Sequence, residues 1–210
     1  HKDMNKKEAK EWAMELFNMV GIPNASTRIK DYAHQFSGGL RQRAMIAMAI
    51  SCEPKLLIAD EPTTALDVTT QAQILDLLQE LQEKHKMAMI LITHNLGVVA
   101  EVCDDVAVMY LGRGAEQGPV DSIFHDSKHP YTKGLLESIP SINSVQGERL
   151  KSIVGSIPPP FNRPKGCTFH PRCPSFIKDV CDKHTPQYLP LNDVQRVSCF
   201  LHHDPKKEVE

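Results

Sequence analysis

The chain has 210 residues, a formal net charge of −2 and six cysteines. This length allows one sizeable domain, or one and a half, with enough residues for a substantial core. The nearly balanced charge gives no indication of a nucleic-acid partner or of an anionic membrane surface. No apolar stretch approaches the length of a membrane-spanning helix, and no charged-then-apolar leader is present. We therefore expect a soluble, cytosolic protein without a disulfide scaffold.

The first 52 residues carry the signals of two helices. Apolar residues spaced along one face predict an amphipathic helix over 6–20. Gly21 then fits the left-handed position that ends a helix. The nearly continuous apolar run 44–50 predicts a buried helix, and Cys52 at its end is expected to be an inert core thiol.

A serine and two glycines precede that second helix. Ser37 is a good N-cap, and Gly38 and Gly39 leave backbone amides uncovered at the start of the helix. Such a helix N-terminus attracts anions. Most triplets of this kind are only turns, and the spacing of this one before Asp60 is what favours a site.

Two adjacent carboxylates follow a short apolar run within residues 55–61. Four consecutive apolar residues favour a central strand of a parallel sheet, buried on both faces. The strand ends at Asp60 and Glu61, and Pro62 prevents its continuation. Because open parallel sheets bind ligands beyond the carboxyl ends of their strands, both acids lie where chemistry is expected. Taken alone, the motif is equally compatible with an ordinary solvated turn.

The following segments complete a β-α-β pattern. Residues 68–84 predict its connecting helix, and residues 87–93 predict a second buried strand that ends just before His94. Residues 104–110 predict an edge strand pair, with 111–118 as its turn. The pattern indicates an α/β fold built on a parallel sheet.

Four motifs in this order resemble the second half of an ATP-binding cassette (ABC) ATPase. Residues 36–43, FSGGLRQR, are similar to the signature motif LSGGQ with its trailing Gln-Arg. Residues 55–61 resemble the Walker B strand with its catalytic Glu, and Ala65-Leu66-Asp67 resembles the D-loop. His94 resembles the switch histidine. The resemblance implies a P-loop NTPase-like parallel sheet with a helical subdomain.

The same resemblance implies a role for each residue. Asp60 would help to hold Mg²⁺, Glu61 would polarise or deprotonate the attacking water, and His94 would contact the γ-phosphate. Asp67 would couple the two ATP sites of a dimer, and the signature residues would serve the ATP bound by the partner. The residues expected to bind ATP or its Mg²⁺ are Ser37, Gly38, Gly39, Gln42, Asp60 and Asp67.

The phosphate-binding loop of such ATPases has no counterpart in this sequence. No G-x-x-x-x-G-K-[ST] motif is present, and the chain starts at His1 in a charged helix. Because a cradle of backbone amides and a Lys holds the β- and γ-phosphates in these enzymes, we expect this chain to be the C-terminal portion of a longer subunit.

The C-terminal part of the sequence resembles one group of ABC ATPases in particular. Residues 128–136, KHPYTKGLL, and the following 138–140 resemble the C-terminal extension of ATPases from oligopeptide, dipeptide and nickel importers. As an alternative, His-Pro-Tyr could merely initiate a helix. Residues 140–166 are rich in Ser, Pro and Gly and predict an extended linker.

Four cysteines are spaced C-x₅-C-x₇-C-x₁₇-C near the end of the chain. In a cytosolic chain, clustered cysteines favour a metal over disulfides. Four thiolates suit a tetrahedral Zn²⁺ site or a [4Fe–4S] cluster, and the spacing alone does not separate the two. The similar importer ATPases carry an iron–sulfur cluster here, so the resemblance implies a [4Fe–4S] cluster, with Zn²⁺ as the alternative. The expected ligands are Cys167, Cys173, Cys181 and Cys199.

We therefore expect a helical subdomain over 1–52, an ATPase core over 53–125 and a Cys-rich importer extension over 126–210. The implied function is that of an ATP-binding and ATP-hydrolysing subunit, at the cytoplasmic face of the bacterial inner membrane, that energises import of dipeptides or oligopeptides. It would pair with a homologous ATPase or with itself. The pair would dock on two transmembrane permease subunits and, through them, act with a peptide-binding protein. The alternative is a non-hydrolysing, metal-binding regulatory fragment, or the partner-activating half of an ATPase dimer.

Overall fold

The computed structural model describes residues 1–139 and 152–203, which fall into two compact units divided between His94 and Asn95. Residues 140–151 of the predicted linker lie outside the described residues. No helix in the described ranges is long and apolar enough to cross a membrane. The functional division into 1–52, 53–125 and 126–210 stays a prediction.

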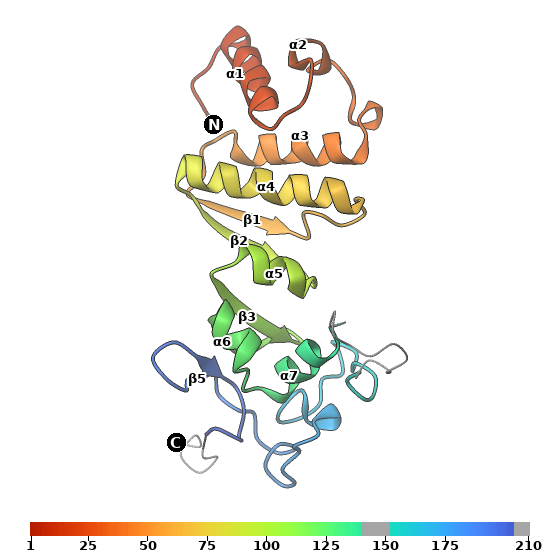
Figure 1. Ribbon diagram of the computed structural model, residues 1–210, viewed down its shortest axis with the longest axis vertical. Helices are drawn as coiled ribbons and strands as arrows, with labels where there is room; N and C mark the ends of the chain where they lie inside the picture. The colour runs from red at the N-terminus through yellow and green to blue at the C-terminus, as the bar shows by residue number, and fades with distance from the viewer. Residues whose placement is uncertain (140–151, 204–210) are drawn as a thin grey trace. The chain divides into compact units, whose positions relative to one another are not determined.

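In the first unit, helices are layered over one face of a two-stranded parallel sheet (Figure 1). The two strands pair in register from Leu56 opposite Ala88 to Asp60 opposite Ile92, and a helix connects them, which confirms the predicted β-α-β unit. The elements are α1 (Lys6–Met19), α2 (Ala25–Arg28), η1 (Ala33–Gln35), α3 (Gly38–Ile50), β1 (Leu56–Asp60), α4 (Val68–His85) and β2 (Ala88–Ile92).

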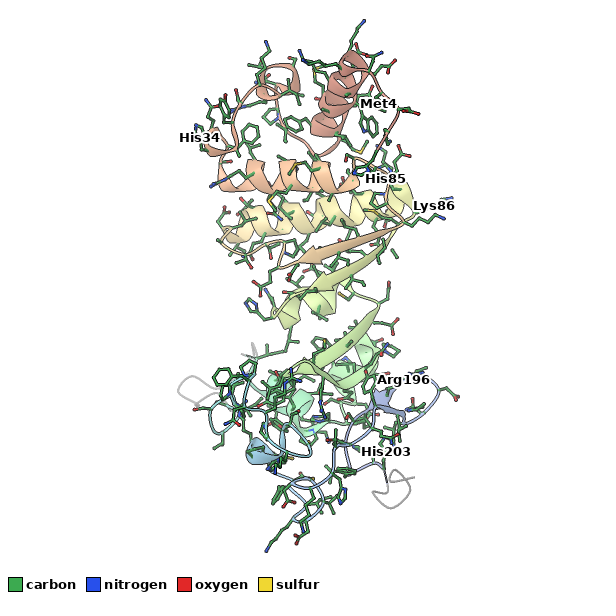
Figure 2. The ribbon with its side chains drawn as sticks, turned by 180° about the vertical axis from the view of Figure 1, so that it is seen from behind. Met4, His34, His85, Lys86, Arg196 and His203 are labelled. Carbon is green, nitrogen blue, oxygen red and sulfur yellow. The ribbon has the colours of Figure 1, made fainter. Side chains whose placement is uncertain are left out.

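Local signals in the sequence set the helix ends of this unit. Asn5 caps α1, and Gly21 has the predicted positive φ of 71° after its last turn. The Arg43 guanidinium donates a hydrogen bond of 2.6 Å to the carbonyl of Val20, which ties the end of α1 to α3. The last residues of α4 carry basic side chains, and Lys86 adopts a left-handed conformation where the chain turns toward β2 (Figure 2).

β1 is buried on one face only, so the prediction that it is buried on both faces is wrong. The predicted burial of β2 is also wrong, because its residues are at most half-buried. Leu57 and Ala59 pack in a core formed largely by the apolar face of α4. The alternate residues Leu56 and Ile58 are 46% and 60% exposed, and Ile90 on β2 is 48% exposed on the same face. A continuous apolar run does not reveal which face is covered, because successive side chains point to opposite faces.

The prediction of a wholly buried helix over 44–50 is also wrong. Ile46, Ala47 and Ile50 of α3 are buried, whereas Met45 and Met48 are 56% and 68% exposed. Cys52 is exposed rather than a core thiol. The helix therefore packs through one face, as most helices of globular domains do.

The second unit contains an antiparallel sheet of strand order β3-β4-β6-β5. Residues 113–119 form a full strand of this sheet, so the prediction of a turn over 111–118 is wrong. The turn is only Leu111-Gly112, both with positive φ, as in tight two-residue hairpins. The elements are α5 (Leu96–Val102), β3 (Asp105–Tyr110), β4 (Arg113–Pro119), α6 (Val120–His125), α7 (Pro130–Glu137), η2 (His170–Arg172), β5 (Leu189–Pro190) and β6 (Arg196–Val197).

A fully buried carboxylate joins β4 to the start of α7. The side chain of Glu116 accepts the backbone N–H of Lys128 at 2.6 Å and that of His129 at 2.9 Å. His129 is itself the N-cap of α7 and accepts the N–H of Tyr131 at 3.0 Å. The His-Pro-Tyr stretch therefore does initiate a helix, and Glu116 fixes where that helix begins.

Glu116→Ala is expected to destabilise the protein by about 3 kcal/mol, because it leaves the buried N–H of His129 and the part-buried N–H of Lys128 without their acceptor. Glu116→Gln keeps one acceptor oxygen and should lose less stability than Glu116→Ala. Urea unfolding of the three proteins measures the differences. Equal stability of Glu116→Ala and the native protein would contradict the role of the carboxylate.

Candidate functional site

The ends of β1 and β2 bring the two predicted catalytic side chains together. The backbone N–H of Glu61 donates to the carbonyl of Ile92 at 2.8 Å, which extends the strand pairing by one residue. His94 follows two residues later, and its Nδ1 lies 3.0 Å from Oε1 of Glu61. Asp60, the last residue of β1, is exposed beside them. Two residues 33 positions apart in the sequence thus meet at one edge of the sheet.

The Glu61 carboxylate has a second partner that the sequence reasoning missed. The hydroxyl of Thr64 donates to Oε2 of Glu61 at 2.9 Å. This hydrogen bond and, after it, the one with His94 hold the pKa of Glu61 below its ordinary value. Glu61 is therefore a carboxylate at neutral pH. Its side chain is 44% exposed and that of His94 is 83% exposed, so both are open to a ligand.

The signature glycines lie against the segment that follows Glu61. Ser37 caps α3 through a 3.3 Å hydrogen bond from the N–H of Leu40, which confirms its prediction as an N-cap. A Cβ placed on Gly38 would lie 3.4 Å from the Leu66 side chain, and one placed on Gly39 would lie 2.8 Å from the methyl of Thr70.

Two further predicted site residues lie in the same unit. Asp67 caps α4, with Oδ1 accepting the Thr70 N–H at 3.0 Å and Oδ2 accepting its hydroxyl at 2.7 Å. These bonds, led by the hydroxyl of Thr70, hold the pKa of Asp67 below its usual range. Thr70 therefore links the predicted D-loop residue to Gly39. Gln42 is half-buried on α3.

The four predicted metal ligands line one small cavity in the second unit. Cys167, Cys173, Cys181 and Cys199 share it with His129, Phe169 and His170. The N–H of Cys167 donates to the carbonyl of Cys181 at 2.8 Å, which holds two of the cysteine segments together. The ring Nδ1 of His170 lies 2.8 Å from the carbonyl of Cys167. Cysteines up to 32 positions apart in sequence thus converge, as the metal-site prediction requires.

The cysteines that line this cavity are of a type that binds metals, but the spacing of their side chains does not fit a metal ion. Burial raises the pKa of Cys167 and Cys173, and raises that of Cys199 to about 12, so these thiols are neutral at physiological pH. No three His, Cys, Asp or Glu residues in the described ranges form a group arranged to hold a metal ion. A metal would have to draw the sulfur atoms closer together and displace their protons.

Comparison with known proteins shows which families the chain is similar to. The family described as "ABC transporter" matches residues 1–64, and that described as "Oligopeptide/dipeptide transporter, C-terminal region" matches residues 115–181. The oligopeptide transport ATP-binding protein AppD of Bacillus subtilis (strain 168) is 51% identical over 99% of this chain and 63% of its own length. The chain is similar to proteins of the ABC transporter family. The dipeptide transport ATP-binding protein DppD of Escherichia coli (strain K12) is 49% identical over 95% of this chain and 60% of its own length.

Solved ABC structures agree with the fold. CbiO1 of Clostridium perfringens, described as part of the ABC transporter complex cbiONQ, is 32% identical and superposes with a TM-score of 0.51 over 60% of this chain and 49% of that chain. A putative metal-chelate type ABC transporter in an inward-facing conformation is 25% identical, with a TM-score of 0.54 over 64% of this chain and 50% of its own. The chain spans about three fifths of the length of the curated relatives named above.

The contact between Gly39 and Thr70 predicts an asymmetry within the ABC signature. Gly39→Ala is expected to destabilise the protein by about 1–3 kcal/mol, because the added methyl meets a side chain whose rotamer Asp67 holds. Gly38→Ala is the matched control, since its methyl would make only ordinary contact with Leu66. Thermal unfolding of both variants measures the difference. Equal effects of the two substitutions would contradict this packing argument.

Proposed function

We propose that this chain contributes the hydrolytic edge of an ATP-binding and ATP-hydrolysing subunit. The observation that carries the proposal is the 3.0 Å contact between Glu61 and His94 beside the exposed Asp60. A carboxylate in contact with an exposed imidazole, next to a second carboxylate at the end of a parallel strand, suits attack of water on a phosphoryl group.

Each residue of this edge has a role that its contacts support. Glu61, held as a carboxylate, accepts a hydrogen bond from the attacking water and then its proton. His94 contacts the γ-phosphate through its exposed ring. Mg²⁺, when bound, neutralises phosphate charge, and Asp60 would hold it, directly or through its water shell. Ser37, Gly38, Gly39 and Asp67 serve the ATP held by the partner subunit through the N-terminus of α3 and the start of α4.

The substrate and partners are proposed from the relatives. AppD and DppD are described as oligopeptide and dipeptide transport ATP-binding proteins. We propose that this subunit likewise energises import of dipeptides or oligopeptides, at the cytoplasmic face of the inner membrane. It pairs with a homologous ATPase or with itself, and this pair acts on two transmembrane permease subunits that receive peptide from a binding protein.

A non-hydrolysing regulatory fragment is the less favoured alternative. Asp60, Glu61 and His94 are all retained, and the last two are in hydrogen-bond contact. A module that only binds metal has no need for that contact. The test is ATP turnover of the full-length subunit with its partners, in the native form and as Glu61→Gln. The native protein should hydrolyse ATP, and absence of turnover would contradict the proposal.

We further propose that Cys167, Cys173, Cys181 and Cys199 hold a [4Fe–4S] cluster, with Zn²⁺ as the alternative occupant. Their shared cavity supports this proposal, because four thiols that converge from separate segments suit soft metals. The role of the group is structural, because it would join two segments of the chain. Cys199 follows β6, whereas the other three cysteines lie in the segment before β5. Iron, sulfide and zinc content of the purified subunit tests it, and absence of all three would contradict it.

A further inference from the structure

Thr64 is attached to Glu61 through both its backbone and its side chain. Its N–H donates to the Glu61 carbonyl at 3.1 Å, and its hydroxyl donates to Oε2 of the same residue at 2.9 Å. Glu61 has a positive φ of 45°, an uncommon conformation for a residue other than glycine. The turn from Glu61 to Thr64 therefore fixes both the backbone and the carboxylate of the proposed base.

Hydrogen bonds from α4 hold this turn in place. The side-chain amide of Gln71 donates to the carbonyl of Thr63 at 3.2 Å and to that of Leu66 at 3.0 Å, and it is half-buried there. Gln71 belongs to the first turn of a helix of 18 residues whose apolar face lies in the core. Thr64 thus lies in a segment that hydrogen bonds attach to the long helix α4.

The other partner of the carboxylate is held much less firmly. The side chain of His94 is 83% exposed and reaches Oε1 of Glu61 from the chain just beyond β2. A histidine that contacts the γ-phosphate has to turn its ring toward the substrate. A carboxylate held by His94 alone would lose its orientation at that moment, because a half-exposed Glu side chain has several accessible rotamers.

We propose that Thr64 is a positioning residue that keeps the Glu61 carboxylate aimed at the attacking water while His94 turns to the γ-phosphate. The inference rests on the proposed ATPase function of this site. The Thr64 hydroxyl occupies one of about four acceptor positions of the carboxylate, so Glu61 can still accept a hydrogen bond from water. Thr64 acts through the Glu61 carboxylate rather than on the reacting atoms.

The test is steady-state ATP hydrolysis by the full-length subunit assembled with its partners. Thr64→Val keeps the shape of the side chain and removes the hydroxyl, so kcat is expected to fall about tenfold with the KM for ATP unchanged. Thr64→Ser keeps the hydroxyl and should retain turnover close to the native rate. Thr27→Val, the same substitution at an exposed position of α2, should leave kcat unchanged.

The inference would be overturned by native kcat in Thr64→Val, by an equal loss in Thr27→Val, or by failure of Thr64→Ser to retain turnover. A change in KM or in the thermal unfolding midpoint of Thr64→Val would also count against it, because the hydroxyl would then support the turn itself. Thr64→Ala, which lacks the hydroxyl and the branched side chain, must reproduce the kcat loss. Glu61→Gln separates the two proposals: native turnover in that variant refutes the ATPase site, whereas its inactivity beside a fully active Thr64→Val refutes only the role of Thr64.

Discussion

Replacing Glu61 with Gln in the full-length subunit is expected to lower ATP turnover by about 10²- to 10⁴-fold, the usual contribution of a general base. Gln keeps the size of the side chain, and its amide oxygen can still accept the hydrogen bond from the Thr64 hydroxyl. It cannot take a proton from water. ATP binding should persist, because the proposed nucleotide contacts come from other residues. Single-turnover hydrolysis and ATP binding, measured separately on the assembled transporter, check both parts.

The matched control is Glu80→Gln, which makes the same change at an exposed position of α4. It should turn over ATP at the native rate. Unchanged turnover in Glu61→Gln would place hydrolysis at the Walker B residues of the partner subunit. This chain would then act as the partner-activating half of the dimer, which was the alternative indicated by the sequence.

The sequence predicted the longer helices and the two strands of the first unit, but not the short α2 and η1, because the signals of the former are local. Ser37 is a recognisable N-cap, Gly21 marks a left-handed helix end, and the apolar period of α4 is regular. The meeting of Glu61 and His94 also follows from general rules, since both residues end neighbouring parallel strands. The order of motifs was therefore enough to predict where the candidate site lies.

The partners of these residues could not be predicted in the same way. A Thr three residues after an acid is an ordinary turn signal, and nothing in the sequence shows that the hydroxyl of Thr64 reaches the Glu61 carboxylate. The burial of Glu116 depends on two backbone amides 12 and 13 residues away. The exposure of Ile58 depends on which face of β1 the helices cover. Each of these is a tertiary contact without a local signature.

Cys199→Ser is expected to weaken metal affinity by at least about 10- to 100-fold, the loss that even the removal of supporting groups causes at metal sites, and so to lower the metal content of the purified chain. Cys199 is buried, lines the shared cavity and follows β6, which pairs with β4 through Val197 and Glu116. Its thiol has a pKa of about 12 in the metal-free protein because burial disfavours the thiolate. Metal binding therefore has to release a proton, and apparent affinity should rise with pH.

Cys52→Ser is the matched control, because Cys52 is an exposed thiol in the first unit and does not line the cavity. Iron, sulfide and zinc are measured per chain in the native subunit and in both variants. Iron and sulfide lost only from Cys199→Ser would support the cluster, and zinc lost in the same pattern would identify the alternative occupant. Equal metal content in all three proteins would contradict a site at these cysteines. Because a bound metal would join Cys199, after β6, to the loop that carries the other three cysteines, the loss of metal should also increase proteolytic cleavage between β5 and His203.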